Sequence, residues 1–329
     1  MTHGRDPALH RLGPLGFGTS TLGNLYEAIS DELAGSTVEA AWDAGIRYFD
    51  TAPHYGLGLS ERRLGRALVG RPQNGLVLST KVGRLIEDGH PPRSDLDSQF
   101  DVTSTARRRW DFTADGVRRS MNDSLERLGL DRIHIALVHD PDEHVEEAID
   151  EAVPALCRLR DEGIIDAVGV GTNDAGLATR FVTACDLDVV MIAGRYTLLD
   201  QSAARELLPG CLERGIGVVA AAPFNSGLLA SRAPATGGRF DYAAAPEEIV
   251  GRAAAIAAVC EEHGVDLPQA ALRFPLQHPA VATVVASART PTEVTQNAGR
   301  AIAAAARGAA EWAELWTDLR ARGLIAREG

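Results

Sequence analysis

The sequence predicts a (β/α)8 barrel, a closed ring of eight parallel strands with long loops at its C-terminal face. Eight short apolar runs recur along the 329 residues, and helical patterns separate them. Each run is nearly continuous in apolar character, as expected of parallel strands covered on both faces. Repeated strand–helix units imply a parallel sheet, and eight of them favour a closed barrel over an open one. The whole chain, residues 1–329, is therefore expected to form one domain.

The expected elements follow in chain order. The strands are 15–19 (LGFGT), 46–51 (IRYFDT), 76–82 (LVLSTKV), 133–140 (IHIALVHD), 166–172 (DAVGVGT), 188–194 (DVVMIAG), 217–224 (GVVAAAPF) and 281–287 (VATVVAS). The helices are 37–45, 60–70, 113–129, 146–163, 175–185, 203–215 and 247–264. Several of these helices end in a glycine, which suits the left-handed backbone of a helix C-terminus, among them Gly45, Gly129, Gly163, Gly215 and Gly264.

Two connections are unusually long. Residues 83–112 are polar and carry no helical period, and residues 225–246 are rich in glycine, alanine and proline. Both follow a predicted strand, so both are expected at the C-terminal face of the barrel. Long loops at that face usually bind ligands or close over them, although disordered insertions are the alternative.

Bulk composition excludes several classes of partner. The net charge of -12 leaves no basic excess to bind nucleic acid or an anionic membrane. No apolar stretch approaches the roughly 18 residues of a membrane span, and the N-terminus lacks the apolar core of a secretory signal. The four cysteines form no C-x-x-C pair, which indicates free thiols in a reducing compartment. We therefore expect a cytoplasmic protein with a small-molecule substrate, as a monomer or a small homo-oligomer.

Four ionisable side chains gather at the ends of predicted strands. Asp50 closes the second strand, and Tyr55 follows it in the segment FDTAPHYG. Lys81 closes the third strand and His139 the fourth. In a barrel the C-terminal ends of the strands meet at one rim, where active sites lie. The sequence therefore predicts a proton-handling site formed by these four residues.

The chemistry of these groups suits hydride transfer at a carbonyl or a carbinol. A free tyrosine has a pKa of about 10, and a nearby ammonium stabilises the phenolate. Lys81 is expected to lower the pKa of Tyr55 in this way, while Asp50 holds Lys81 charged and oriented. His139 would hydrogen-bond the substrate oxygen.

The motifs FDTAPHYG, SERRLG, STK, LVHD and SLERLGLDRI resemble those of the aldo-keto reductases, in the same order along the barrel. The resemblance runs from LGFGT to TPTEVTQN, nearly the whole chain. It implies a (β/α)8 fold, a nicotinamide cofactor and the catalytic residues Asp50, Tyr55, Lys81 and His139.

The resemblance also implies where the cofactor binds, since the chain has no G-x-G-x-x-G fingerprint of a Rossmann fold. The implied cofactor residues are Gly18, Thr19, Asp50, Thr172, Asn173, Phe224, Asn225, Ser226, Gly227, Leu228, Ser287, Arg289, Glu293 and Asn297. The chain departs from the family pattern in two places. Ala193 or Gly194 stands where the family often has a glutamine, and Ala221 or Ala222 where it often has a stacking aromatic residue.

The residues after the last strand bear on the choice between NAD and NADP. NADP-selective members place basic residues there, because a 2′-phosphate needs cations. Glu293 aligns with the expected arginine, and its carboxylate would repel a phosphate. Arg289 could still pair with one. NAD is therefore expected over NADP, which favours the oxidising direction.

The segments HDPDEH and AGRYTLLDQS are similar to those of the NAD-linked branch of the family, whose members oxidise aldoses such as L-fucose or D-threo-aldoses to lactones. Alternatives are a pyridoxal 4-dehydrogenase and an NADPH-dependent carbonyl reductase. His54 and Trp110 are the candidate substrate contacts.

Two functions from other classes remain open. HDPDEH offers His139, Asp140, Asp142 and His144 to a metal-dependent hydrolase, but no H-x-H pair accompanies them, so no metal is expected. The other is a non-catalytic barrel that binds cofactor as a regulatory subunit. All four proton-handling positions are intact, which argues against it.

Overall fold

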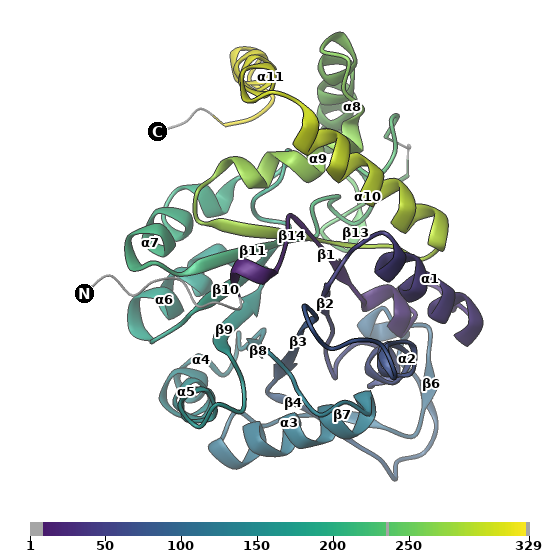
Figure 1. Cartoon of the computed structure of the whole chain (residues 1–329), viewed down its shortest axis with the longest axis vertical. Coiled ribbons are helices and arrows are strands. Elements are labelled where there is room, and N and C mark those ends of the chain that lie inside the picture. The colour runs from purple at the N-terminus through teal and green to yellow at the C-terminus, as the bar shows by residue number, and fades with distance from the viewer. Residues whose placement is uncertain (1–8, 235–236, 327–329) are drawn as a thin grey trace.

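The computed structural model describes residues 9–234 and 237–326, and its centre is a closed barrel of parallel strands (Figure 1). The order around the ring is β1-β14-β11-β10-β9-β8-β3-β2, so the last strand closes the barrel against the first. The strands are β1 (Leu15–Gly18), β2 (Tyr48–Asp50), β3 (Val77–Val82), β8 (Ile135–His139), β9 (Ala167–Thr172), β10 (Val189–Ala193), β11 (Gly217–Ala221) and β14 (Val281–Ser287). Each predicted run forms one barrel strand, which confirms the predicted fold.

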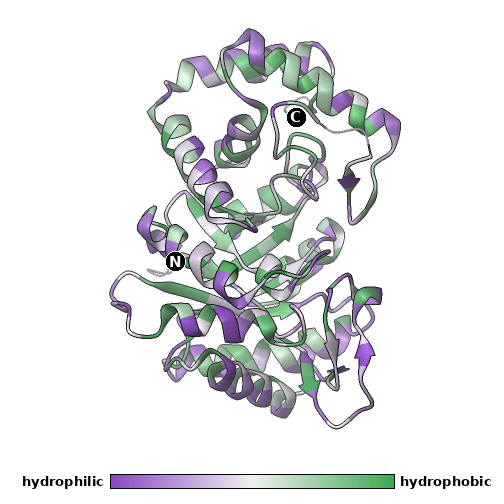
Figure 2. Ribbon diagram, turned by 90° about the vertical axis from the view of Figure 1, so that its right-hand side faces the viewer, coloured by the Kyte–Doolittle hydropathy of each residue, from purple (hydrophilic) through white to green (hydrophobic). Residues whose placement is uncertain are grey.

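The strands are buried on both faces, which explains their continuous apolar character. One apolar layer, with Phe49 and Val168, packs outward against the helices. A second layer, with Leu137 and Val219, fills the barrel interior. Figure 2 shows the central strands as largely hydrophobic, while the surrounding helices alternate hydrophobic and hydrophilic residues. Burial of these two layers is the main source of stability.

Helices surround the barrel in Figure 1. They are α1 (Asp31–Asp43), α2 (Leu59–Leu68), α3 (Ala114–Leu128), α4 (Val145–Glu147), α5 (Val153–Asp161), α6 (Ala175–Ala184), α7 (Leu207–Arg214), α8 (Glu247–Glu262), α9 (Leu267–Arg273), α10 (Pro291–Ala306) and α11 (Ala309–Ala321). A π-helical turn (Ala148–Ala152) joins α4 to α5 inside the predicted helix 146–163. Short 3-10 turns are Leu9–Arg11, Ser20–Gly23, Leu96–Ser98, Ser202–Ala204 and Phe274–Gln277.

Some helix bounds differ from the prediction. Helix α1 begins at Asp31 rather than residue 37, because the Ser30 side chain accepts a hydrogen bond from the backbone N–H of Leu33 and caps the helix. Helices α9, α10 and α11 were not among the predicted helices. The five predicted C-terminal glycines all have positive φ, between 62° and 87°, which confirms their role.

Both long connections leave the C-terminal end of a barrel strand, as predicted. Residues 83–112 carry two antiparallel pairs, β4 (Arg84–Glu87) with β7 (Arg107–Trp110) and β5 (Arg93–Ser94) with β6 (Thr103–Ser104). Residues 225–246 contain the pair β12 (Arg239–Phe240) and β13 (Ala243–Ala244), and residues 235–236 lie outside the described part.

The opposite end of the barrel is closed. Leu9, in the first 3-10 turn, and Leu12 are buried with the inner strand residues Val189 and Ile135. This N-terminal segment therefore plugs the bottom of the barrel and leaves the C-terminal mouth for ligands.

The cysteines bear on the expected free thiols, and the helices bear on the expected lack of a membrane span. Cys157, Cys185, Cys211 and Cys260 are all free thiols, as predicted. In residues 9–234 and 237–326, no helix has both the length and the apolar character to cross a bilayer.

Candidate active site

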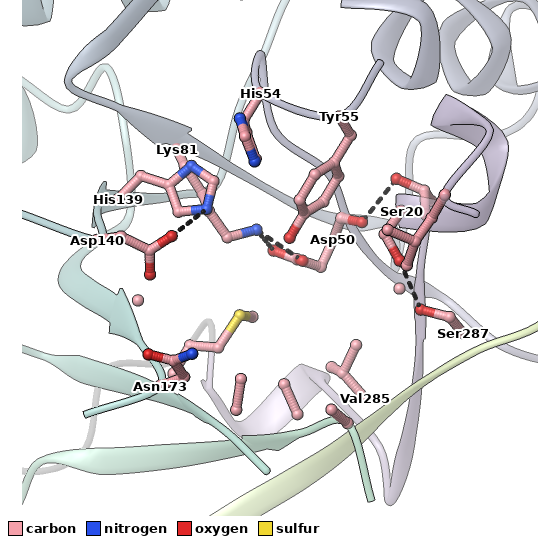
Figure 3. A pocket seen from close by; sticks show the side chains of 18 of the residues that line it. Ser20, Asp50, His54, Tyr55, Lys81, His139, Asp140, Asn173, Val285 and Ser287 are labelled. Carbon is pink, nitrogen blue, oxygen red and sulfur yellow. Dashed lines mark hydrogen bonds and ion pairs between the residues drawn. The ribbon is translucent and has the colours of Figure 1, made fainter. Parts of the chain in front are cut away.

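A cavity of about 300 Å³ at the mouth of the barrel is lined by all four predicted catalytic residues: Asp50, Tyr55, Lys81 and His139 (Figure 3). Gly18, Thr19, His54, Thr172, Asn173 and Ser287 from the predicted set line it as well. The structure thus brings together residues that lie far apart in the sequence.

Asp50 and Lys81 form a buried ion pair. The Lys81 ammonium donates to both Asp50 carboxylate oxygens, at 3.0 and 2.8 Å, and to the Thr51 carbonyl at 2.9 Å. Burial by itself would lower the pKa of Lys81. The Asp50 carboxylate and the Tyr55 phenol outweigh that effect, and the net pKa is raised. Lys81 therefore stays charged although almost no water reaches it.

Neighbouring strands hold Asp50 in place. The Ser79 hydroxyl donates to Asp50 Oδ1 at 2.7 Å, and the buried Tyr48 hydroxyl lies 3.1 Å from Ser79 Oγ. The backbone carbonyl of Asp50 accepts from the N–H and the hydroxyl of Thr19, at 2.9 and 2.8 Å. Residues of β2 and β3 therefore fix the carboxylate, and Thr19, just after β1, fixes the Asp50 backbone, before any ligand binds.

Tyr55 lies close to both the ammonium of Lys81 and the imidazole of His139. Lys81 Nζ is 4.8 Å from the Tyr55 ring centroid, and the ring centroids of Tyr55 and His139 are 6.0 Å apart. Burial raises the pKa of Tyr55, while Lys81 acts to lower it. The expected lowering by Lys81 is present, but burial outweighs it, so the net shift is upward. The resting phenol is neutral and can donate a proton.

His139 is neutral as well. Burial, with help from the cations Arg84 and Lys81, holds its pKa well below the ordinary value. Its Nε2 lies 3.4 Å from Asp140 Oδ2, and its Nδ1 is buried with no hydrogen-bond partner among the described residues. Asp140 in turn pairs with Arg84 at 2.8 Å. Burial raises the pKa of Asp140 in spite of that cation.

A second cavity of about 330 Å³ adjoins the first and shares Ser20, Ala222 and Tyr242 with it. Its lining includes the predicted cofactor residues Phe224, Asn225, Ser226, Gly227, Ser287, Arg289 and Glu293. The joined cavities form an elongated site, as a dinucleotide needs.

Two observations make the second cavity suitable for a cofactor. Asn225, Ser226 and Gly227 have φ values of 45°, 57° and 95°, a left-handed turn that costs free energy at the first two positions. The Asn225 side-chain oxygen is buried with no partner among the described residues. Strained backbone and an unpaired polar atom together fit a nicotinamide dinucleotide at this place.

The residues at the two places where the chain departs from the family pattern line the cavities. Ala193 and Ala222 line both cavities, Ala221 lines the first, and Gly194 lines the second. Neither a glutamine amide nor a stacking ring is supplied there.

Arg289 is already engaged. Its guanidinium donates to the Glu27 carboxylate at 2.8 Å and to the Leu25 carbonyl at 2.7 Å. Glu293 accepts from the backbone N–H of Arg289 at 2.7 Å. The carboxylates of Glu27 and Glu293 therefore both lie close to this arginine.

Three predicted site residues are not brought to the cavities. Leu228 and Asn297 are buried and line neither one. Trp110 is exposed and lies beside Arg84, whose guanidinium is 5.6 Å from its ring centroid. The antiparallel pairing of Trp110 with Arg84 places it at the end of β7 nearest the barrel, but its side chain does not line either cavity.

The pocket also contains residues that the sequence reasoning missed. Phe100 and Tyr242 come from the two long loops, and Met191 comes from β10. The available signal for the first two was an aromatic residue inside a long loop that follows a barrel strand. Their pairing with the catalytic residues depends on how the loops fold back.

The residues of HDPDEH are separated. His139 and Asp140 line the pocket, whereas His144 pairs with Glu147 at 3.3 Å and packs against the Phe112 ring. Within the described part of the chain, no group of three or more His, Cys, Asp or Glu residues could hold a metal ion.

Comparisons with known proteins agree with this geometry. Residues 14–314 match the Aldo/keto reductase family. The chain is 50% identical over 305 residues to a D-threo-aldose 1-dehydrogenase of a Pseudomonas species, covering 92% of each chain. It is 40% identical to a pyridoxal 4-dehydrogenase of Microbacterium luteolum, covering 94% of each. The solved holo form of an aldo-keto reductase from Bacillus halodurans is 26% identical with a TM-score of 0.72, covering 96% of this chain and 92% of that one. The chain belongs to the aldo/keto reductase family and is an oxidoreductase.

Proposed function

We propose that the protein oxidises a cyclic hemiacetal sugar of the L-fucose or D-threo-aldose type to a lactone, with NAD as the hydride acceptor. The observation that carries the proposal is the convergence of Tyr55, the Lys81–Asp50 pair and a neutral His139 on one buried cavity. The 50% identity to a D-threo-aldose 1-dehydrogenase supports the substrate class.

Each of the four residues has its own role in the proposed oxidation. A bound nicotinamide supplies the acceptor for the hydride that leaves the carbinol carbon. Oxidation requires that Tyr55 first release its own proton to solvent, and the resulting phenolate oxygen then takes the hydroxyl proton as the C–O bond becomes a carbonyl. The Lys81 ammonium stabilises the phenolate that this requires, and Asp50 holds Lys81 in position. The neutral imidazole of His139 orients the reacting oxygen.

NAD rather than NADP is proposed from the charges of the second cavity. Thr172 and Asn173 would hold the nicotinamide carboxamide, and residues 224–227 would follow the pyrophosphate. A 2′-phosphate would meet the Glu293 carboxylate, and Arg289 is already paired with Glu27. NAD carries no phosphate there, so it avoids that repulsion.

The test is steady-state turnover of the purified protein on a panel of free aldoses and pyridoxal, with NAD and NADP in parallel. We expect turnover on an aldose with NAD well above NADP. Turnover on pyridoxal alone would assign the activity of the relative that is 40% identical. Activity only as an NADPH-dependent carbonyl reductase would contradict both the cofactor and the direction. Cofactor binding without turnover would indicate a non-catalytic subunit.

Tyr55→Phe is the variant that tests the proton transfer. Loss of the phenol hydroxyl should lower turnover about 10²- to 10⁴-fold, as is typical when an acid–base group is removed. Cofactor affinity, measured by titration, should stay close to that of the wild type.

A further inference from the structure

We propose that Arg108 is a positioning residue that fixes the tautomer of His54, so that His54 donates a hydrogen bond to the substrate hydroxyl on the carbon next to the reacting carbon. This inference rests on the proposed oxidation of a hemiacetal sugar. It adds a requirement for a neighbouring hydroxyl, which a 2-deoxy sugar lacks.

Arg108 is held by a complete set of hydrogen bonds. Its Nε donates to His54 Nδ1 at 2.6 Å, and its Nη2 donates to the His54 carbonyl at 2.8 Å. The other donors reach Asp95 Oδ1 and Oδ2, both at 2.6 Å, and Ser98 Oγ at 3.2 Å. These are five bonds from the five N–H groups of a guanidinium. The Arg108 and Asp95 side chains are only 8% and 10% exposed, so little water competes.

These contacts determine the state of the imidazole. A guanidinium can only donate hydrogen bonds, so Nδ1 of His54 must be the nitrogen with the lone pair. A neutral ring then carries its proton on Nε2. Burial, together with the cations Arg84, Arg108 and Lys81, keeps the pKa of His54 well below its ordinary value. His54 is therefore a neutral ring with an Nε2–H donor.

The surroundings of His54 direct that donor toward the substrate. His54 lines the catalytic cavity, and its ring lies between Tyr55 and His139 in Figure 3. The ring centroid is 5.5 Å from that of His139 and 6.2 Å from that of Tyr55. Phe100 packs edge-on against it at 5.2 Å. Among the described residues, Nε2 has no hydrogen-bond partner, so it is free for a ligand.

The ionisable groups around the ring come from several elements. They are Tyr55 on the same loop, Lys81 on β3, Arg84 on β4, Asp95 and Arg108 on the 83–112 connection, and His139 on β8. Lys81 and Arg84 remain near the ring in an Arg108 variant, but Nδ1 is then released to take a proton or to exchange tautomers.

The first measurement is the histidine ring nitrogen spectrum of the resting protein by NMR, which needs no substrate. In the wild type, His54 should show the neutral Nε2–H tautomer from pH 5.5 to 8. Arg108→Met should give mixed tautomers or a titration within that range. Arg109→Met is the matched control, because Arg109 pairs with Glu87 and Asp111 instead and should leave His54 unchanged. An unchanged His54 signal in Arg108→Met would overturn the role of Arg108.

The second measurement is kcat/KM on an aldose and on its 2-deoxy analogue. The wild type should prefer the aldose about tenfold, the value of one hydrogen bond. His54→Phe leaves the Arg108–Asp95 pair in place and should abolish that preference. His54→Gln, which offers an amide N–H, should restore part of it. Arg108→Met and the milder Arg108→Lys should reduce it through KM more than kcat.

The two proposals fail in different ways. A wild type that oxidises no hemiacetal contradicts the proposed function, while the NMR result still decides whether Arg108 fixes His54. A wild type that oxidises aldoses but does not distinguish the 2-deoxy analogue overturns the hydroxyl contact. An undiminished preference in His54→Phe overturns it as well.

Discussion

Asp50 and Lys81 carry opposite charges in a place that water hardly reaches. Their mutual attraction offsets the free energy of desolvating the two charges. Side-chain exposure is 3% for Lys81 and 4% for Asp50, so either charge left alone would lose its solvation without compensation. Tyr55 and His139 are neutral in the same cavity. The site therefore carries one permanent charge pair beside two groups that can move or share a proton.

Removal of one partner of this pair should therefore be costly. Lys81→Met should lower the free energy of unfolding by about 3–5 kcal/mol, because it leaves the Asp50 carboxylate buried and unpaired. Urea denaturation followed by circular dichroism measures the change. Arg66→Gln is the control, since it breaks an exposed pair with Asp31 that is worth at most about 1 kcal/mol. Equal losses in the two variants would contradict the buried-pair argument.

The pairing of Arg289 with Glu27 predicts a change in cofactor preference. Glu27→Gln removes the negative charge from the Arg289 guanidinium and frees it for a 2′-phosphate. The ratio of NADP to NAD affinity should rise several-fold, corresponding to about 1 kcal/mol. Fluorescence titration with each cofactor measures the ratio. Glu314→Gln, an exposed residue of α11, removes the same charge and should leave the ratio unchanged.

The sequence predicts that residues at the ends of barrel strands converge on one site, because closure of the barrel alone brings them together. Asp50, Lys81 and His139 are of this kind. Phe100 and Arg108 could not be placed, since their positions depend on how the 83–112 connection pairs with itself. Trp110 lies on the same connection and faces away from the cavity for the same reason.

Among the elements, α2 and α3 show that some family motifs serve packing rather than chemistry. Glu61 of SERRLG is fully buried, and it accepts from the Thr80 hydroxyl at 2.9 Å and from Arg127 Nε at 2.6 Å. Arg127 belongs to SLERLG. The two motifs therefore hold α2, α3 and β3 together behind Lys81.

Gly65 is where α2 and α3 come closest. A Cβ at this position would overlap the backbone carbonyl of Leu128. Gly65→Ala should lower the free energy of unfolding by about 1–3 kcal/mol, because backbone has to shift. Gly299→Ala, at an exposed position of α10 with open space around it, should instead be neutral or stabilising by up to about 1 kcal/mol. Chemical denaturation of both variants tests the contrast, and a stable Gly65→Ala protein would refute the close approach.

The short strands of the 83–112 connection have no signature in the sequence. Strand β7 is RRRW, which has neither the apolar character nor the β-branched residues of a typical strand. It is a strand because β4 pairs with it and because acidic partners such as Glu87 and Asp95 neutralise its arginines. Such pairing is a tertiary effect that periodicity does not reveal.

Over the whole molecule, the two ends of the barrel have different roles. The C-terminal mouth holds the cavity lined by Asp50, Tyr55, Lys81 and His139, and the N-terminal end is closed by Leu9 and Leu12. Continuous apolar runs predict all eight strands, because burial on both faces leaves that signature. Helices α9 to α11, in the C-terminal third of the chain, were not predicted.

The sealed end also makes stability depend on pH. His134 is 7% exposed, and its Nδ1 accepts a hydrogen bond from the backbone N–H of Leu78 at 3.1 Å. Burial lowers the pKa of His134 to about 4, so the unfolded chain binds a proton first as the pH falls. Stability is therefore lost progressively as the pH drops below about 6.5, the ordinary value, toward 4.

Between pH 7 and pH 5, this single residue should cost about 1–2 kcal/mol of unfolding free energy. His134→Gln cannot take up the proton, and its amide oxygen can still accept from Leu78. The variant should therefore lose less stability than the wild type over that range, as measured by denaturant titrations at each pH. The buried His54 and His139 change the unfolding free energy with pH in the same direction in both proteins. The difference between the two curves of unfolding free energy against pH therefore reports on His134. His90→Gln is the control, at an exposed position of the 83–112 connection. Its curve of unfolding free energy against pH should run parallel to that of the wild type. If the His134→Gln curve is parallel as well, the bond to Leu78 does not depend on a neutral imidazole.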